Sequence, residues 1–65
     1  MANHKIFSVK VTGKTPSGQI VTRTETSIKA STDSDARRQA KARASTSWLG
    51  KNKIIDAVVT FWRDL

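Results

Sequence analysis

The chain has 65 residues and carries twelve Lys or Arg against five Asp or Glu, which gives a formal net charge of +7 and a pI near 10.7. A chain this short forms one domain, over residues 1–65, and buries only about 60% of its unfolded surface, which leaves little room for a deep catalytic cleft. It contains no cysteine, which excludes disulfides, a thiolate nucleophile and a zinc site of the usual cysteine type.

The apolar residues are too scattered for a helical membrane protein. No run approaches the roughly 18 apolar residues of a membrane-spanning helix. MANHKIFSV, residues 1–9, lacks the apolar core of a secretory signal. We therefore expect a soluble, cytoplasmic protein that contacts no membrane.

The density of positive charge predicts an anionic partner. Net charge alone can keep a protein soluble, but in so small a body it also attracts phosphate polymers and acidic surfaces. We expect nucleic acid, DNA first, as the partner, and an acidic protein surface as the alternative.

The first segment, HKIFSVKVT at residues 4–12, alternates as a half-buried strand does. Phe7, Val9 and Val11 share one face and polar residues occupy the other. GKTPSG, residues 13–18, then predicts a hairpin turn, because glycine, proline and serine are turn residues. Lys14 is expected to be exposed at the tip of this hairpin. Hairpin tips often contact backbone phosphates.

The second strand is predicted over QIVTRTETSIKA, residues 19–30, because threonine and isoleucine favour β structure. Ile20 and Ile28 have the even spacing of one strand face, and we expect them on the core side. Val21 then falls on the opposite face, which this assignment leaves unexplained.

A helix is predicted within STDSDARRQAKARASTSWLG, residues 31–50. Thr32 or Ser34 can cap its first amides, acidic residues lie where the helix dipole is positive, and Gly50 is a natural stop. One side carries small residues, with Trp48 at its edge: Ala36, Ala40, Ala44 and Ser47. This narrow seam suits close packing on a sheet, with Trp48 filling the open end.

The third strand is IIDAVVTFW, residues 54–62, which is dense in apolar residues. The β-β-α-β order predicts a single α+β domain, a three-stranded antiparallel sheet with the first strand in the middle. One helix packs on one face and leaves the other face uncovered. A homodimer is a further expectation, because a small domain gains stability by covering an open sheet face.

No arrangement of residues predicts catalysis. His4 is the single histidine and lies near the N-terminus, and Asp33 and Asp35 are explained as helix-start residues. GKTPSG is not a phosphate loop, because a Walker sequence places its Lys and Ser or Thr directly before a helix. We expect no enzyme activity, no cofactor and no metal.

The stretch between Ala36 and Ile55, which follows the acidic start of the helix, carries six positive residues and no negative one: Arg37, Arg38, Lys41, Arg43, Lys51 and Lys53. A solvated helix face usually mixes signs and pairs Glu with Lys four residues apart. The one-signed run therefore favours a functional patch over an ordinary wet face. At about 100° per residue the helical cations surround the exposed surface, which favours phosphate contact over the reading of base edges.

The uncovered sheet face is the rival surface. Lys10, Arg23 and Lys29 are expected on it, among serines and threonines. Trp62 of the third strand is a candidate for the same face, where it could stack on a base, and is equally compatible with the core. Trp48 is expected to be a core residue.

Residues 5–44 resemble the arm-type DNA-binding domains of tyrosine-family integrases. The resemblance rests on KIFSVKV, the glycine-containing turn and IVTRTETSIKASTDSDARRQA. In that family the sheet enters the DNA groove, which would make Lys10, Arg23 and Lys29 the contacts. This chain departs from the family in its last strand, because those domains place all their strands before the helix.

The whole β-β-α-β order, with SIKASTDSDA at the strand-to-helix junction, is similar to small phage proteins such as the phage T7 inhibitor of host RNA polymerase. Both resemblances imply a protein of a phage or mobile element. The sequence therefore predicts a small, basic, non-enzymatic DNA-binding protein with largely phosphate-backbone contacts. The alternative is a phage-type protein that inhibits or modulates an acidic host protein such as a transcription enzyme.

Overall fold

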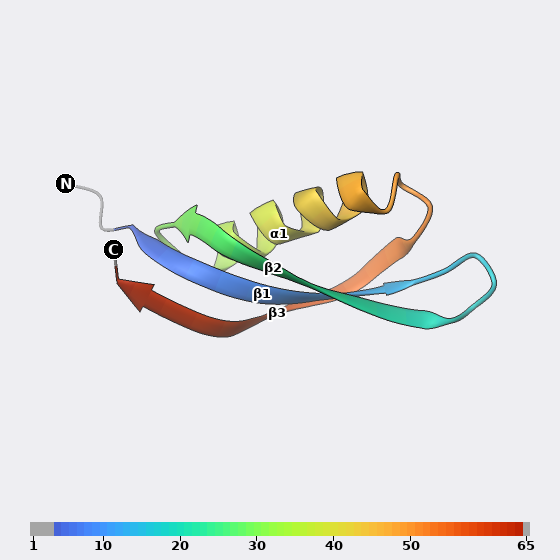
Figure 1. Cartoon of the computed structure of the whole chain (residues 1–65), viewed down its shortest axis with the longest axis horizontal. Coiled ribbons are helices and arrows are strands. Elements are labelled where there is room, and N and C mark those ends of the chain that lie inside the picture. Colours follow the sequence, from blue (N-terminus) through green and yellow to red (C-terminus); the bar gives the residue numbers. More distant parts are fainter. Residues whose placement is uncertain (1–3, 65) are drawn as a thin grey trace.

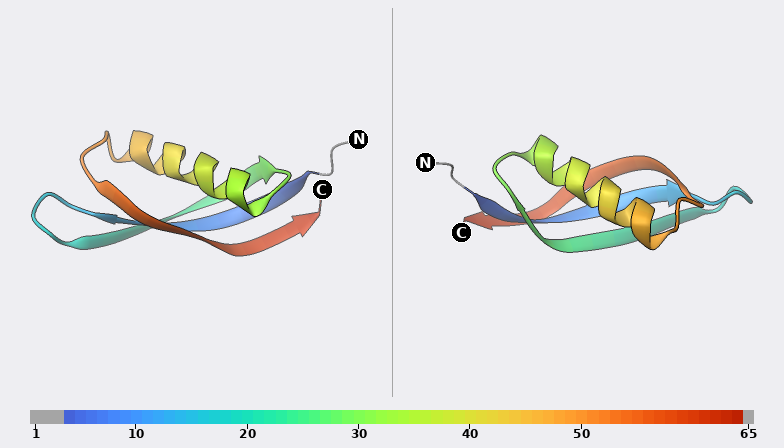
Figure 2. Two further views of the ribbon diagram at one scale, coloured as in Figure 1. Left: turned by 180° about the vertical axis from the view of Figure 1, so that it is seen from behind. Right: turned by 90° about the horizontal axis from the view of Figure 1, so that it is seen from above.

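The computed structural model describes residues 4–64 and confirms the expected fold. In chain order the elements are β1 (Lys5–Lys14), β2 (Ile20–Ala30), α1 (Asp33–Ser47) and β3 (Lys53–Asp64). The strands form one sheet in the order β2-β1-β3, with β1 antiparallel to both neighbours. The helix lies across one face and leaves the other uncovered (Figure 1; Figure 2).

The core lies between α1 and the middle of the sheet. Phe7, Val9 and Val11 of β1 are almost fully buried and form one cluster with the alanine seam of the helix: Ala36, Ala40 and Ala44. Alanine has the smallest side chain with a high helix propensity, so the helix axis can approach the sheet closely. The alternation of β1 and the three alanines of the seam are confirmed, whereas Ser47, expected in the same seam, is exposed.

A β-bulge in β2 corrects the predicted faces of that strand. Phe7 pairs with Ile28, but Val9 pairs with Glu25, so β2 holds one more residue than β1 at this point. Ser27 adopts a left-handed backbone conformation there, with φ of 58°. Because successive residues of a strand point to opposite faces, the extra residue turns Ile20 away from the helix and turns Val21 toward it. Ile28 is buried as expected, whereas Ile20 is exposed.

Two bulges in β3 set which of its apolar residues face the helix. Thr60 lies between the pairs Ser8–Phe61 and Val9–Val59, and Ile55 lies between two further pairs at the other end of the strand. The helix face of β3 therefore carries Ile54, Ala57, Val59 and Trp62. Phe61 and Val58 point to the uncovered face.

Side-chain and main-chain hydrogen bonds define both ends of α1. The hydroxyl of Thr32, rather than Ser34, caps the helix by accepting a hydrogen bond of 3.2 Å from the Asp35 amide. At the other end the amides of Leu49 and Gly50 donate to the carbonyls of Thr46 and Ser45. This pattern is a Schellman motif, in which the first residue past the cap takes the left-handed conformation that glycine prefers. Here that residue is Leu49, with φ of 56°, and Gly50 follows it.

Gly13 belongs to β1 and not to the hairpin turn, which corrects the sequence-based prediction. The turn is closed by hydrogen bonds between Thr15 and Gln19 and between Gly18 and Thr15. At Gly13 the strand instead passes beneath Trp48: a Cβ added there would lie 2.7 Å from the six-membered part of the Trp48 ring. Trp48 packs against the core cluster, which confirms its predicted place at the end of the seam.

No helix within residues 4–64 is long and apolar enough to cross a membrane.

Gly13→Ala should destabilise the fold by about 1–3 kcal/mol, because the new methyl group overpacks the contact with Trp48. Urea unfolding followed by tryptophan fluorescence measures the change. In a Trp48→Leu background the same substitution should cost much less, since the ring is gone. An equal cost in both backgrounds would show that Trp48 does not set the requirement for glycine.

Leu49→Gly should stabilise the protein by about 0.5–1 kcal/mol, because glycine adopts the left-handed conformation without a steric penalty. Little burial is lost, since Leu49 is 77% exposed. Thermal unfolding measures the gain, and Leu49→Ala is the matched control, because alanine keeps a Cβ and so keeps the penalty. A gain for alanine equal to that for glycine would contradict this explanation.

Candidate nucleic-acid interface

The register of the sheet assigns each strand residue to one of two faces. Because directly paired residues of antiparallel strands point to the same side, the partners of buried Phe7, Val9 and Val11 face the helix. The intervening residues of β1 and their partners form what we call the open face. Its charged residues are Lys10 and Lys14 from β1, Lys29 from β2, and Lys53, Asp56 and Arg63 from β3.

Nearly all charged residues of the open face are positive. Five positive residues and one acid give it a formal charge of +4. The acid, Asp56, already accepts a hydrogen bond of 2.9 Å from the amide of Ala57. Of the ten cations that the sequence singles out as candidates, the structure gathers Lys10, Lys14, Lys29 and Lys53 on this face.

The rest of the molecule has a mixed charge. It carries seven positive residues and four acids, hence +3, and the two faces together account for the +7 of the chain. Two of these cations form the ion pairs found within residues 4–64, Arg23 with Glu25 and Arg38 with Asp35. The open face therefore has the larger net charge, +4 against +3, and holds only one of the five acids.

Arg23 does not lie on the open face, which corrects the sequence-based assignment. It is the direct partner of Val11 and so points to the helix side, beside Glu25. The cause is again the bulge at Ser27, which reverses the orientation of every β2 residue before it. Glu25 is only 8% exposed, so the charge of Arg23 serves to neutralise a mostly buried carboxylate.

Two polar side chains of α1 join the helix to β2. The Arg43 guanidinium donates a hydrogen bond of 3.2 Å to the carbonyl of Thr26, and Gln39 donates one of 3.0 Å to the carbonyl of Lys29. They are four residues apart and so lie on one side of the helix. Arg43 is therefore engaged in holding the helix on the sheet, although its side chain remains at the surface.

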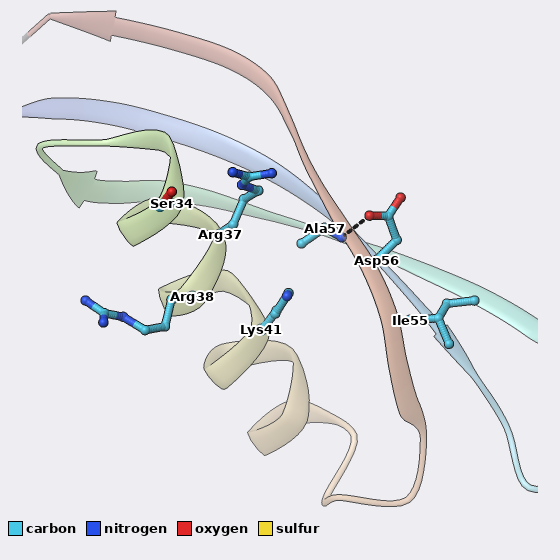
Figure 3. A pocket seen from close by; sticks show the side chains of 7 residues that line it. All are labelled: Ser34, Arg37, Arg38, Lys41, Ile55, Asp56 and Ala57. Atoms are coloured by element: carbon cyan, nitrogen blue, oxygen red, sulfur yellow. Dashed lines mark hydrogen bonds between the residues drawn. The ribbon is translucent and has the colours of Figure 1, made fainter.

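Arg37 and Lys41 lie on the other side of α1, over a groove between the helix and β3. Figure 3 shows both side chains extending toward β3, whereas Arg38 points away from it. The predicted arrangement of cations around the helix, not in a stripe, is confirmed. Asp56 also lines this groove, but its carboxylate lies on the side of β3 away from the helix (Figure 3).

A second cluster of cations lies at the hairpin end of the molecule. Lys14 and Lys53 are direct cross-strand partners, and Lys51 lines the same shallow pocket. Like charges directly opposite each other on a sheet are destabilising. This end of the molecule thus carries an electrostatic cost that an anion bound there would relieve.

Exposed apolar side chains accompany the cations of the open face. Phe61 is 58% exposed and Val58 is 50% exposed. Phe61 pairs with Ser8, and Val58 pairs with Lys10, so both lie on the edge strand β3 beside the middle of β1. Trp62, the sequence-based candidate for this position, instead faces the helix side, where the Lys5 ammonium lies 4.2 Å from its ring centre.

Sequence reasoning therefore missed three residues that β3 contributes to the open face, Val58, Phe61 and Arg63. In IIDAVVTFW apolar residues occupy both odd and even positions, so apolar and polar residues do not alternate. The pattern therefore predicts a strand but not which of its residues face the helix. The run Phe61-Trp62-Arg63 did contain a signal, because consecutive aromatic residues must place one ring on each face.

Within residues 4–64 no group of three or more His, Cys, Asp or Glu side chains could hold a metal ion. His4 is exposed at the start of this range.

No protein-family model matches the chain, and neither a curated protein nor a solved structure shows significant similarity to it. The resemblances to arm-type integrase domains and to small phage inhibitors therefore stay predictions from sequence pattern.

Proposed function

We propose that this protein is a small, non-enzymatic DNA-binding protein of the type that phages and mobile elements encode, and that it contacts chiefly the phosphate backbone. The open face of the sheet and the lysines at the hairpin end form the binding surface. The cations of the helix have a secondary part, because Arg38 is paired with Asp35 and Arg43 donates to the carbonyl of Thr26.

One observation carries the proposal: acids are almost absent from the cationic face that no other element covers. Four of the five acids lie on the helix side of the molecule, whereas the open face has five cations and a single acid. A solvated face that serves only solubility has no need of one sign. A face that binds a polyanion benefits from positive charge alone, because each phosphate contact releases condensed counterions and so adds to affinity.

An acidic protein is the second candidate, and Phe61 and Val58 favour it, because exposed apolar residues are usual at the centre of protein interfaces. The two candidates differ in a simple measurement. Phosphate-backbone binding predicts affinity for DNA of any sequence, with a steep dependence on salt. A protein-specific surface predicts weak DNA binding even at low salt.

Titration of the protein against labelled random-sequence DNA at several salt concentrations tests the proposal. We expect micromolar or tighter binding at low salt and a slope of log K against log salt of several units, about 0.9 for each phosphate contact on a duplex. Fluorescence anisotropy measures both quantities. Absence of binding at low salt would overturn the proposal and favour the acidic-protein candidate.

Two triple variants of equal charge locate the surface. Replacing Lys10, Lys29 and Arg63 by Gln should reduce the salt slope by about 2 to 3 units, because three phosphate contacts are lost. Replacing Arg37, Arg38 and Lys41 by Gln removes the same charge from the helix and should change the slope much less. The reverse result would place the contact surface on the helix.

Lys14→Thr should increase stability at low salt by about 0.2–1 kcal/mol, because it removes the cross-strand repulsion with Lys53. The gain should shrink at high salt, where the repulsion is screened. The same variant should bind DNA more weakly. Lys29→Thr is the control for stability, since the direct partner of Lys29 on β1 is Ile6 and not a cation. Thermal unfolding at two salt concentrations measures the difference.

A further inference from the structure

We infer that the open face binds single-stranded nucleic acid, with Phe61 as a platform on which an unpaired base stacks. This inference rests on the proposed function, because it takes nucleic acid as the partner. It adds the form of the strand and the residue that distinguishes it.

The position of Phe61 carries the inference. The ring projects from β3 on the open face and is 58% exposed, which makes it a large apolar surface in contact with water. Its cross-strand partner is Ser8, a small residue that leaves the side of the ring over the middle of the sheet accessible. The bulge at Thr60 is what turns this ring, and not that of Trp62, toward the open face.

Cations lie on both sides of Phe61 along the sheet. Arg63 follows it by two residues on the same strand and face, and the pair formed by Lys10 and Val58 lies on its other side. The next cations, Lys14 and its partner Lys53, lie about 13 Å farther along β1 than Lys10, at roughly 3.3 Å per residue. A chain that runs along the sheet can therefore place phosphates beside these cations while a base lies over the ring.

Charge complementarity selects the occupant. Two copies of this chain placed face to face would bring together two surfaces of +4, which opposes a dimer through the open face. A polyanion gains from the same charge. A single strand additionally offers unstacked bases, which stack on exposed aromatic side chains, whereas the bases of a duplex are already stacked on one another.

Competition between strand forms tests the inference. The probes are a labelled oligodeoxythymidine of about 16 nucleotides and a duplex of equal length. We expect the single strand to bind more tightly at the same salt concentration. Phe61→Ala should weaken single-strand binding roughly 5- to 150-fold, the usual effect of removing one stacking platform. Its effect on duplex binding should be small, and Phe61→Trp should keep the single-strand affinity.

Trp62→Ala is the matched control, because it removes the neighbouring aromatic residue from the opposite face. It should leave single-strand affinity unchanged, since Trp62 contacts Lys5 on the helix side. Circular dichroism and the unfolding midpoint of each variant show that the fold is kept. An oligouridine arm of equal length shows whether the platform also accepts RNA, as base stacking alone would allow.

The outcomes separate the inference from the proposed function. Equal affinity for the two strand forms, with no effect of Phe61→Ala, would overturn stacking while backbone binding stands. An equal loss of affinity for the single strand and the duplex in Phe61→Ala would also overturn it, because the ring would then act only through packing. If neither probe binds at low salt, both the inference and the proposed function fail.

Discussion

Close packing of an alanine seam on the central strand is the interaction on which the rest of the structure depends. Ala36, Ala40 and Ala44 lie directly against the row of Phe7, Val9 and Val11, and all six side chains are essentially buried. One helix of 15 residues can seal only a narrow part of a three-stranded sheet. The contact therefore stabilises one side of the sheet and leaves the other in water. The small core also explains why single contacts matter, such as that of Trp48 with Gly13.

The one-sided core has an electrostatic consequence. Acids are needed on the helix side, where Asp33 and Asp35 lie in the first turn of α1 and Glu25 pairs with Arg23. The open face has no such internal requirement, and its cations remain directed to solvent. The same segregation that favours a polyanion also brings Lys14 and Lys53 together at a cost in stability. Surfaces that bind a charged ligand often carry such a cost, which the ligand offsets when it binds.

Sequence patterns predict the parts of this protein that depend on local physics. The alternation in β1, a cap from Thr32 or Ser34 and the alanine spacing of α1 each follow from the geometry of a single element. The structure has all three, with Thr32 as the cap. Patterns were wrong for Ile20 and Arg23, and they missed Phe61. All three errors have one origin, which is an extra residue at Ser27 or Thr60 that reverses the orientation of what lies beyond it. Neither residue is a glycine or proline, so the residue type at these positions does not indicate a bulge in the sequence.

The sequence by itself therefore determined the order of elements, the buried row of β1, the seam of the helix and the excess of positive charge. The tertiary structure alone decided which cations share a surface. Side-chain direction in a strand has a period of two, so the face of a residue depends on how many residues separate it from a fixed point of the register. That count depends on pairing with another strand, because a bulge is a property of two strands together. Only the assembled sheet could bring Lys10, Lys29, Phe61 and Arg63 to one face and turn Arg23 to the other.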